Sequence, residues 1–221
     1  MTLKVGGITP FSTTDFPGKL ATVMYVQGCP WHCTYCHNPH LQARQAANLV
    51  PWERALAFLR QRVGLVEAVI FSGGEPTLDP ALAGAIGEVR ALGFMAGLQT
   101  ACIYPARLQQ VLPLIDWIAF DVKAPFADYA NVTGVADSAL TVQECIDMIV
   151  ASGVEHECST TIHPRCKRRK GWKNWPRRSR RWGSSATPCA IFASKAAATC
   201  NSSACPRVFR GPTRWRASRR C

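Results

Sequence analysis

The sequence predicts an α/β protein with a parallel sheet and helices outside it, and two observations lead to this prediction. Through about residue 163, apolar stretches of strand length alternate about five times with helical stretches, at the spacing of βαβ units. Glycine, polar and cysteine residues gather directly after the strand stretches. Because ligands of such folds bind at the carboxyl ends of the strands, we expect one ligand site at that end of the sheet.

The expected strands are short and rich in β-branched and aromatic residues, which fit a pleated and buried surface. Residues 21–27 (Ala-Thr-Val-Met-Tyr-Val-Gln) show this composition most clearly, and the next strand runs into Gly73 and Gly74. The last expected strand is rich in Thr and Ile. The complete set is residues 21–27, 67–72, 94–100, 116–121 and 155–163.

The expected helices carry start and stop signals. Pro51 and Pro105 stand near the starts of two of them, where the missing N–H of proline removes no helical hydrogen bond. Gly93 and Gly153 follow the ends of two, where a left-handed residue commonly caps a helix. The complete set is residues 51–62, 80–91, 104–112 and 139–151.

The net charge of +12 is unevenly distributed and divides the chain into two parts. Residues 1–163 contain 9 Lys and Arg and all 14 Asp and Glu, a net charge of −5, whereas residues 164–221 contain 17 Lys and Arg and no acidic residue. Apolar periodicity also stops after His163. We therefore expect a mildly acidic domain over residues 1–163 and a basic tail without a stable fold over residues 164–221.

The sequence contains no apolar stretch long enough to span a bilayer, and its N-terminus lacks the apolar run of a signal peptide. We therefore expect a cytoplasmic protein without membrane association. In a reducing compartment, clustered cysteines more often bind metal than form disulfides. Three of the 11 cysteines are clustered, and five lie after residue 163.

Cys29, Cys33 and Cys36 follow the first expected strand directly. Three thiolates at this spacing fit three irons of a [4Fe-4S] cube, because soft thiolate ligands suit iron–sulfur clusters. The fourth iron would stay open to a ligand from outside the protein. A zinc site completed by His32 or His37 is the alternative. Zinc sites usually place a second ligand pair a dozen or more residues away, and nothing at that distance qualifies.

The Cys-x3-Cys-x2-Cys spacing, with Tyr35 before the last cysteine, resembles the radical S-adenosylmethionine signature. The flanking residues 15–18 (Asp-Phe-Pro-Gly), 27–33 and 36–39 (Cys-His-Asn-Pro) resemble those of the glycyl-radical-enzyme activases. Within these, the chain is most similar to the anaerobic ribonucleoside-triphosphate reductase activating proteins, and the pyruvate formate-lyase activases come next. The resemblance covers roughly residues 1–163.

This resemblance implies a partial (β/α) barrel, here expected to be incomplete at its C-terminal end, with a [4Fe-4S] cluster and S-adenosylmethionine as cofactors. It implies an oxidoreductase that cleaves S-adenosylmethionine with one electron to methionine and a 5′-deoxyadenosyl radical, which takes a hydrogen atom from a glycine of the partner. The partner would be a glycyl-radical enzyme, first of all the large subunit of anaerobic ribonucleotide reductase. The electron donor would be a protein such as flavodoxin or ferredoxin.

The resemblance also assigns a role to Gly73, Gly74 and Glu75, which look like the GGEP motif of the family. The backbone of that motif meets the methionine amino group of the cofactor. Taken alone, these residues would indicate only a turn between a strand and a helix. Asp15 and Asn38, which stand near the cysteines in the family-like segments, are expected to shape turns.

Further candidates for cofactor binding end the later strands. Lys123 stands with Asp121 in an Asp-x-Lys element similar to one in the family, and its ammonium would neutralise the methionine carboxylate. Thr100 and His163 also end strands, where the family places polar residues near the ligand. The alternative for these residues is a solvated strand end or a loop.

The basic tail has two explanations. Its Trp residues interleave with Arg, and residues 167–170 (Lys-Arg-Arg-Lys) form a charge run, which would suit nucleic-acid binding through phosphates and stacking. Against this, the tail contains five cysteines and no acidic residue, and it begins abruptly after Pro164. We favour out-of-frame translation of a GC-rich gene. In that case the fold would lack its last helix and strand, and activity would belong to the intact parent sequence.

Three functions therefore compete. The first is an activase of a glycyl-radical enzyme, either anaerobic ribonucleotide reductase or another such as pyruvate formate-lyase. The second is a radical S-adenosylmethionine enzyme that acts on a small molecule. The third, from another class, is a metal-stabilised nucleic-acid-binding protein. The family-like residues 15–18 and 36–39 favour the first.

We predict that the coding DNA around codons 163–166 shows the origin of the tail. Adding or removing one base near codon 165 should restore acidic residues, a helix and a strand, because out-of-frame translation ignores the periodicity that a fold needs. Sequencing the gene checks this expectation. If all three frames encode equally basic and patternless sequence, the frameshift is excluded and a nucleic-acid-binding arm is the better account.

Overall fold

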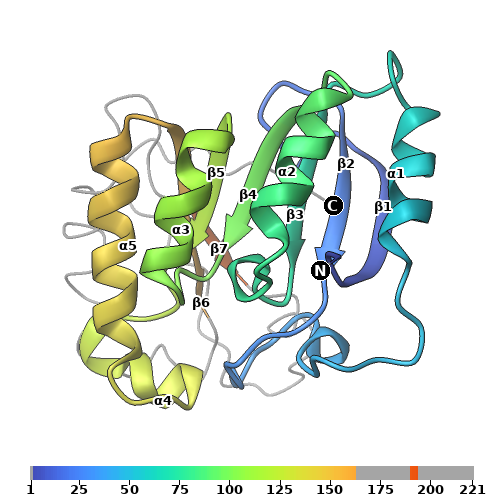
Figure 1. Ribbon diagram of the computed structural model, residues 1–221. Helices are drawn as coiled ribbons and strands as arrows, with labels where there is room; N and C mark the ends of the chain where they lie inside the picture. The colour runs from blue at the N-terminus through green and yellow to red at the C-terminus, as the bar shows by residue number, and fades with distance from the viewer. Residues whose placement is uncertain (1, 163–189, 194–221) are drawn as a thin grey trace.

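The computed structural model describes residues 2–162 and 190–193, which form one sheet with its helices (Figure 1). The sheet has seven strands in chain order from β1 to β7. β1 runs antiparallel to β2, and every later pair is parallel. The strands are β1 (Val5–Ser12), β2 (Ala21–Val26), β3 (Ala68–Gly73), β4 (Met95–Thr100), β5 (Trp117–Asp121), β6 (Glu155–Ile162) and β7 (Ala190–Ala193).

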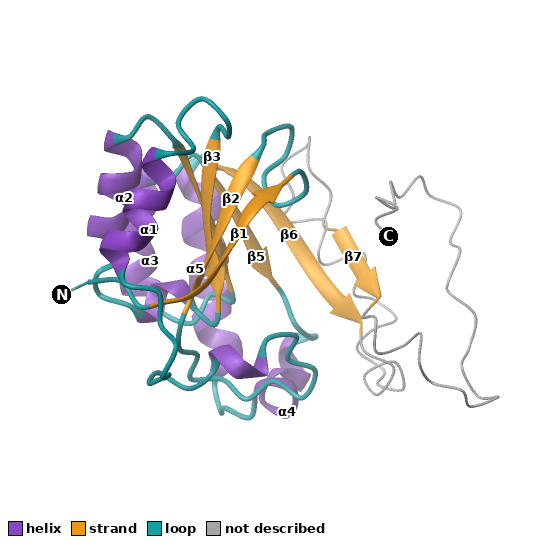
Figure 2. Cartoon of the chain, turned by 90° about the vertical axis from the view of Figure 1, so that its right-hand side faces the viewer, coloured by secondary structure: helices purple, strands orange, loops and turns teal. Residues whose placement is uncertain are grey.

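Most of the helices cover one face of the sheet, and Figure 2 shows them on the same side of the strands. The exception is a short helix that lies beyond the end at which the parallel strands finish (Figure 1). On the face are α1 (Trp52–Arg60), α2 (Leu82–Ala91), α3 (Pro105–Val111) and α5 (Ser138–Ser152), and beyond the strand ends is α4 (Tyr129–Thr133). Short 3-10 helices span Pro39–Leu41, Pro76–Leu78, Leu112–Leu114 and Phe126–Asp128.

The alternation of side chains along the strands divides the core in two. In β3, Phe71 belongs to the large apolar cluster that includes the helix residues, whereas Ile70 belongs to a smaller cluster on the other face. Phe16 and Trp117 are also part of the smaller cluster, with ring centroids 5.4 Å apart. Ser72 follows two residues after Ile70 and lines a cavity. The face without helices is therefore filled by apolar side chains near the strand starts and hollow near the strand ends.

All the expected strands and helices are present, and their ends differ from the expected ones by no more than two residues. Parallel pairing from β2 to β6 confirms the α/β class and the predicted parallel sheet. The patterns succeed here because the strands β2 to β5 are largely buried and the helices on the sheet bury one apolar face, which produces clear composition signals.

β1 and α4 are not among the predicted elements. Gly6, Gly7 and Pro10 interrupt the composition of β1, and its pairing with β2 is irregular between Val5 and Gly7 and again before Ser12. Such glycines and proline argue against a strand unless it lies at an edge, which is where β1 lies. α4 has five residues, which is too short to show a helical period.

β7 corrects the expectation that no strand follows residue 163. It pairs in parallel with β6, with Ala190 opposite Ser159 and Ala193 opposite Ile162. The physical reason is that Ala-Ile-Phe-Ala is a short strand-prone run, and the edge of β6 offers backbone groups that need partners. Residues 163–189 and 194–221, and with them the rest of the expected basic tail, lie outside the described residues. None of the described helices is long and apolar enough to cross a membrane.

Candidate functional site

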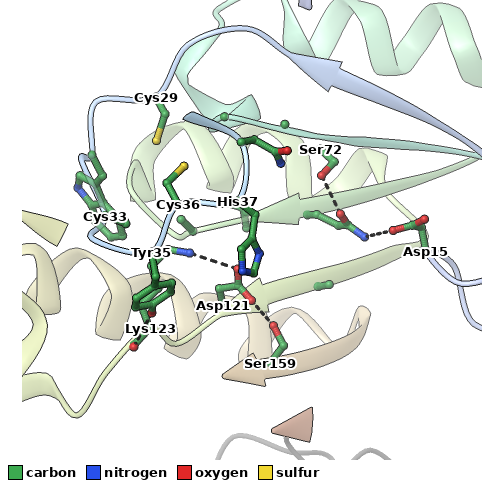
Figure 3. A pocket seen from close by; sticks show the side chains of 18 of the residues that line it. Asp15, Cys29, Cys33, Tyr35, Cys36, His37, Ser72, Asp121, Lys123 and Ser159 are labelled. Carbon is green, nitrogen blue, oxygen red and sulfur yellow. Dashed lines mark hydrogen bonds and ion pairs between the residues drawn. The ribbon is translucent and has the colours of Figure 1, made fainter. Parts of the chain in front are cut away.

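A cavity of about 370 Å³ lies at the carboxyl ends of the parallel strands. Its wall comes from the loop after β2, from the last residues of β3, β4 and β5, from β6, and from the turn between β1 and β2. Figure 3 shows this cavity from close by. It lies at the end of the sheet where the sequence analysis expects a ligand.

The three clustered cysteines all line this cavity. Each is a partly exposed free thiol, and Figure 3 shows the sulfur atoms of Cys29 and Cys36 pointing toward each other. Burial raises the pKa of Cys29 to about 12, and it also raises the pKa of Cys33. Both groups are therefore neutral thiols at neutral pH until a cation displaces their protons, as iron does when thiolates bind it.

The far side of the cysteine loop is held by α4. The backbone N–H groups of His32 and Thr34 donate to the carbonyl oxygens of Thr133 and Val132, each at 3.1 Å. The last carbonyl groups of a helix have no partner within the helix, and here the loop supplies partners for two of them. The short helix that the sequence analysis missed thus fixes the cysteine loop in place.

Gly73 and Gly74 lie where β3 comes closest to the cysteine loop, and both line the cavity. Gly73 has a φ of +117°, and a Cβ built there would lie 2.5 Å from the backbone nitrogen of Val26. A Cβ on Gly74 would lie 2.3 Å from the carbonyl oxygen of Gly28. Both positions therefore require glycine, and the absence of side chains leaves their backbone groups at the cavity wall.

Glu75 differs from these glycines, because it is fully buried and does not line the cavity. Its carboxylate accepts hydrogen bonds from the hydroxyl groups of Thr77 (2.5 Å) and Thr100 (2.8 Å). It also accepts from the backbone N–H groups of Thr77 (3.1 Å) and Ala101 (2.8 Å). Burial raises the pKa of Glu75, and these donors offset only part of the increase. Its side chain therefore ties the end of β3 to the end of β4, whereas the cofactor contact that the resemblance implies is one of the motif's backbone.

Asp121 and Lys123 line the cavity as an ion pair after β5, with Nζ 3.2 Å from Oδ2. Burial alone would raise the pKa of Asp121, but Lys123 and the Ser159 hydroxyl hold it below its usual range. Burial alone would lower the pKa of Lys123, but Asp121 and Cys33 hold it above its usual range. The Tyr35 hydroxyl donates to the Lys123 carbonyl at 2.7 Å. The cavity therefore contains an ion pair, and the backbone of Lys123 is tied to the cysteine loop.

A chain of hydrogen bonds that the sequence patterns do not predict runs along the cavity wall (Figure 3). Ser72 Oγ donates to Gln99 Oε1 at 2.7 Å, and Gln99 Nε2 donates to Asp15 Oδ1 at 3.1 Å. The Ser12 hydroxyl donates to Asp15 Oδ2 at 2.5 Å. Asp15, expected only to shape a turn, thus lines the cavity with both carboxylate oxygens bonded. The available signal was a polar residue within each of two otherwise apolar strands.

The structure brings together eight of the expected site residues. His163 lies outside the described residues, so its place near the ligand stays a prediction. Glu75 lies behind the wall. The eight expected residues that line this same cavity are Cys29, Cys33, Cys36, Gly73, Gly74, Thr100, Asp121 and Lys123.

The donor set fits an iron–sulfur cluster better than a single metal ion. Among residues 2–162 and 190–193, no three His, Cys, Asp or Glu side chains are grouped so that they could hold one ion. A zinc site would need four ligands around one ion. In a cluster each thiolate binds a different iron, so the three sulfur atoms need only face a common space. The cavity provides such a space.

Residues 23–164 match the sequence profile of the Radical SAM superfamily. The chain belongs to this superfamily. Its cofactors are accordingly a [4Fe-4S] cluster and S-adenosylmethionine, as the sequence analysis expects. The matched residues begin within β2 and pass through the cysteine loop to the end of β6, so they supply the whole cavity wall except the turn before β2.

Two curated relatives and one solved structure are similar to this chain. A Methanocaldococcus jannaschii protein, provisionally named a glycyl-radical enzyme activating enzyme, is 29% identical over 170 residues, which cover 73% of this chain and 69% of that protein. The pyruvate formate-lyase-activating enzyme of Clostridium pasteurianum is 28% identical over 137 residues, 59% of this chain and 57% of that enzyme. Streptococcus suis SuiB bound to S-adenosylmethionine shares the fold at a TM-score of 0.50 and 16% identity, over 61% of this chain and 32% of SuiB.

The chain thus spans between about half and two thirds of the length of these curated relatives. The part of this radical SAM protein that matches the family, residues 23–164, contains the three cysteines and the cavity wall apart from the turn before β2.

We predict that Gly74→Ala destabilises this radical SAM fold by about 1–3 kcal/mol, the usual cost of overpacking. The added Cβ would lie 2.3 Å from the Gly28 carbonyl oxygen and would push the turn and the cysteine loop apart. Urea denaturation followed by circular dichroism measures the free energy of unfolding.

The matched control is Gly84→Ala in α2, where a Cβ meets nothing within 4 Å. Alanine favours the helix, so this variant should be more stable than the wild type by about 0.5–1 kcal/mol. A Gly74→Ala variant as stable as the wild type would contradict the close contact.

Proposed function

We propose that this chain is the activase of a glycyl-radical enzyme, which uses a [4Fe-4S] cluster to cleave S-adenosylmethionine and so generates a glycyl radical on a partner protein. The observation that carries the proposal is the common cavity shared by the three cysteines, the Gly73–Gly74 turn and Lys123. The activase names of the Methanocaldococcus and Clostridium relatives support the class of partner.

In this proposal, Cys29, Cys33 and Cys36 hold the cluster. The bound cluster and S-adenosylmethionine would together supply a one-electron cleavage to methionine and a 5′-deoxyadenosyl radical. The backbone of Gly73 and Gly74 faces the cavity and is available to the methionine amino group. The Lys123 ammonium would pair with the methionine carboxylate, since Lys123 lines the cavity.

The other candidate residues support these contacts. Asp121 fixes the direction of the Lys123 ammonium through their 3.2 Å contact. Thr100 lines the cavity and donates to Glu75, so both residues stabilise the wall that carries the glycines. His163, which directly follows β6 in the sequence, would contact the cofactor from that side.

For the partner, we propose the large subunit of anaerobic ribonucleoside-triphosphate reductase, on the resemblance of residues 15–18 and 36–39. Pyruvate formate-lyase is the second candidate, and the Clostridium relative favours it. Either glycyl-radical enzyme would present a peptide segment to the open cavity. An electron donor such as flavodoxin or ferredoxin would reduce the cluster.

We predict that Cys29→Ala, Cys33→Ala and Cys36→Ala each abolish S-adenosylmethionine cleavage, because each removes the thiolate of one iron. The full chain is reconstituted with iron and sulfide under anaerobic conditions. Iron content, absorbance near 400 nm and formation of 5′-deoxyadenosine are measured.

Cys145→Ala is the control, because Cys145 is a buried free thiol outside the cavity. It should keep iron content and cleavage. Full iron content and cleavage in any of the three cavity variants would overturn the cluster assignment. Electron paramagnetic resonance of the reconstituted chain mixed with each candidate partner decides between the two glycyl-radical enzymes. A glycyl-radical doublet on pyruvate formate-lyase alone would identify that enzyme, and not ribonucleotide reductase, as the partner.

We predict that Lys123→Ala weakens S-adenosylmethionine binding by about 10- to 150-fold, since a hydrogen bond to a charged group contributes about 1.5–3 kcal/mol. Isothermal titration calorimetry with the reconstituted chain measures the dissociation constant. Lys19→Ala removes the same charge from the surface pair Lys19–Glu67 at the other end of β2 and should leave binding unchanged. Equal affinities of the two variants would show that Lys123 does not contact the cofactor.

A further inference from the structure

The cysteine loop leaves and returns to the sheet through a narrow neck, formed by residues 27–29 on the way out and residues 40–44 on the way back. Two backbone hydrogen bonds join the two sides, from Gly28 N–H to the Leu41 carbonyl (2.8 Å) and from Cys29 N–H to the Gln42 carbonyl (2.9 Å). The first cluster cysteine therefore stands directly at the neck.

The Gln27 side chain closes the neck a second time. It is buried, and its Nε2 donates to the carbonyl oxygens of Ala43 (2.6 Å) and His40 (3.1 Å). Gly6 of β1 makes room for it, since a Cβ there would lie 2.4 Å from Gln27 Oε1.

Arg44 joins this neck to the segment that follows the Gly73–Gly74 turn. Its Nη1 donates to the Gln27 carbonyl at 2.6 Å, and its Nη2 lies 2.8 Å from Asp79 Oδ2. Arg44 thus joins both sides of the neck, because the residue itself belongs to the returning side and its guanidinium group binds Gln27 on the outgoing side. Its second contact fixes the neck to Asp79, which lies five residues after Gly74 in the sequence.

Asp79 is a rigid anchor for this contact. Only 2% of its side chain is exposed, and it also accepts from the backbone N–H groups of Lys4 and Ala81, both at 3.0 Å. Burial alone would raise the pKa of Asp79, but these N–H groups and Arg44 hold it below its usual range. A buried carboxylate that stays ionised keeps a strong requirement for its cation.

We propose that Arg44 is a positioning residue for the iron–sulfur cluster: together with Gln27 and Asp79 it forms a latch that keeps the neck closed and so keeps Cys29 in register with the cavity. This inference rests on the proposed function, because it assigns the latch to the retention of the cluster that the cysteines hold. Arg44 does not line the cavity, so it acts through the loop and not on the ligand.

The consequence for the cluster follows from the position of the latch. A cluster leaves only when its thiolates separate, and separation of Cys29 from the others requires the neck to open. Residues that orient metal ligands without touching the metal typically alter metal affinity by about 10- to 100-fold. Loss of Arg44 should therefore accelerate loss of iron while the sheet stays folded.

The test compares Arg44→Met with Arg90→Met in the reconstituted full chain. Arg90 is a close match, because it also binds one carboxylate (Asp116, 2.6 Å) and one carbonyl group (Leu114, 3.3 Å), but near the amino ends of β4 and β5. Iron transfer to an excess of a ferrous chelator is followed anaerobically. Arg44→Met should release iron about tenfold faster than the wild type or more, and Arg90→Met at the wild-type rate. Equal release rates for the two variants would overturn the proposal.

Amide hydrogen exchange in the cluster-free chain separates the latch from overall stability. In Arg44→Met, the Gly28 and Cys29 amides should exchange faster, whereas the Ile70 amide in β3 should keep its protection. Equal acceleration at all three amides would mean general destabilisation and would overturn the latch. Because this measurement needs no cluster, it tests the latch even if the wild type fails to take up iron, a result that would overturn the proposed function instead.

A double-mutant cycle completes the test. Asp79→Asn should release iron faster than the wild type. The double variant Arg44→Met with Asp79→Asn should release iron at nearly the same rate as Arg44→Met alone, because the two residues act through one contact. Strictly additive effects would show that the residues act separately.

Discussion

The cavity depends on a close backbone contact between the cysteine loop and the turn after β3. Gly28 and Gly74 approach so closely that no Cβ fits between them, and the Glu75 N–H donates to the Gly28 carbonyl at 2.9 Å. The Gly74 N–H donates to the Val26 carbonyl at 3.0 Å, so the ladder between β2 and β3 continues past the strand ends. The cysteine loop and the turn after β3 are therefore held at the distance between paired strands. As a result, the thiols and the glycine turn face the same space once the sheet has folded.

Much of this arrangement is readable from the sequence because its signals are local. The parallel strands β2 to β5 are largely buried and appear as short, mostly apolar runs. The three cysteines stand within one loop, and Lys123 stands two residues beyond the last residue of β5. Parallel strands place all such residues at one end of the sheet, so locating the strands also locates most of the cavity wall.

The remainder depends on contacts between residues far apart in the chain. Glu75 belongs to a recognisable motif, but Thr100 and Ala101, 25 and 26 residues later, decide that its carboxylate points away from the cavity. Arg44 binds Asp79, which lies 35 residues further along the chain, and no sequence pattern near either residue indicates the pair. β7 pairs with β6 across a segment that has no apolar period of its own. Composition and periodicity contain no information about such pairings, which only the folded sheet creates.

The irregular pairing of β1 has a consequence for the solubility of the chain. β1 is an outer strand, and a flat outer strand would offer its free backbone groups to the sheet of another molecule. Its two register shifts twist it locally, and Pro10 removes one N–H from it. The same glycines and proline that hide β1 from sequence analysis therefore protect this side of the sheet against edge-to-edge aggregation.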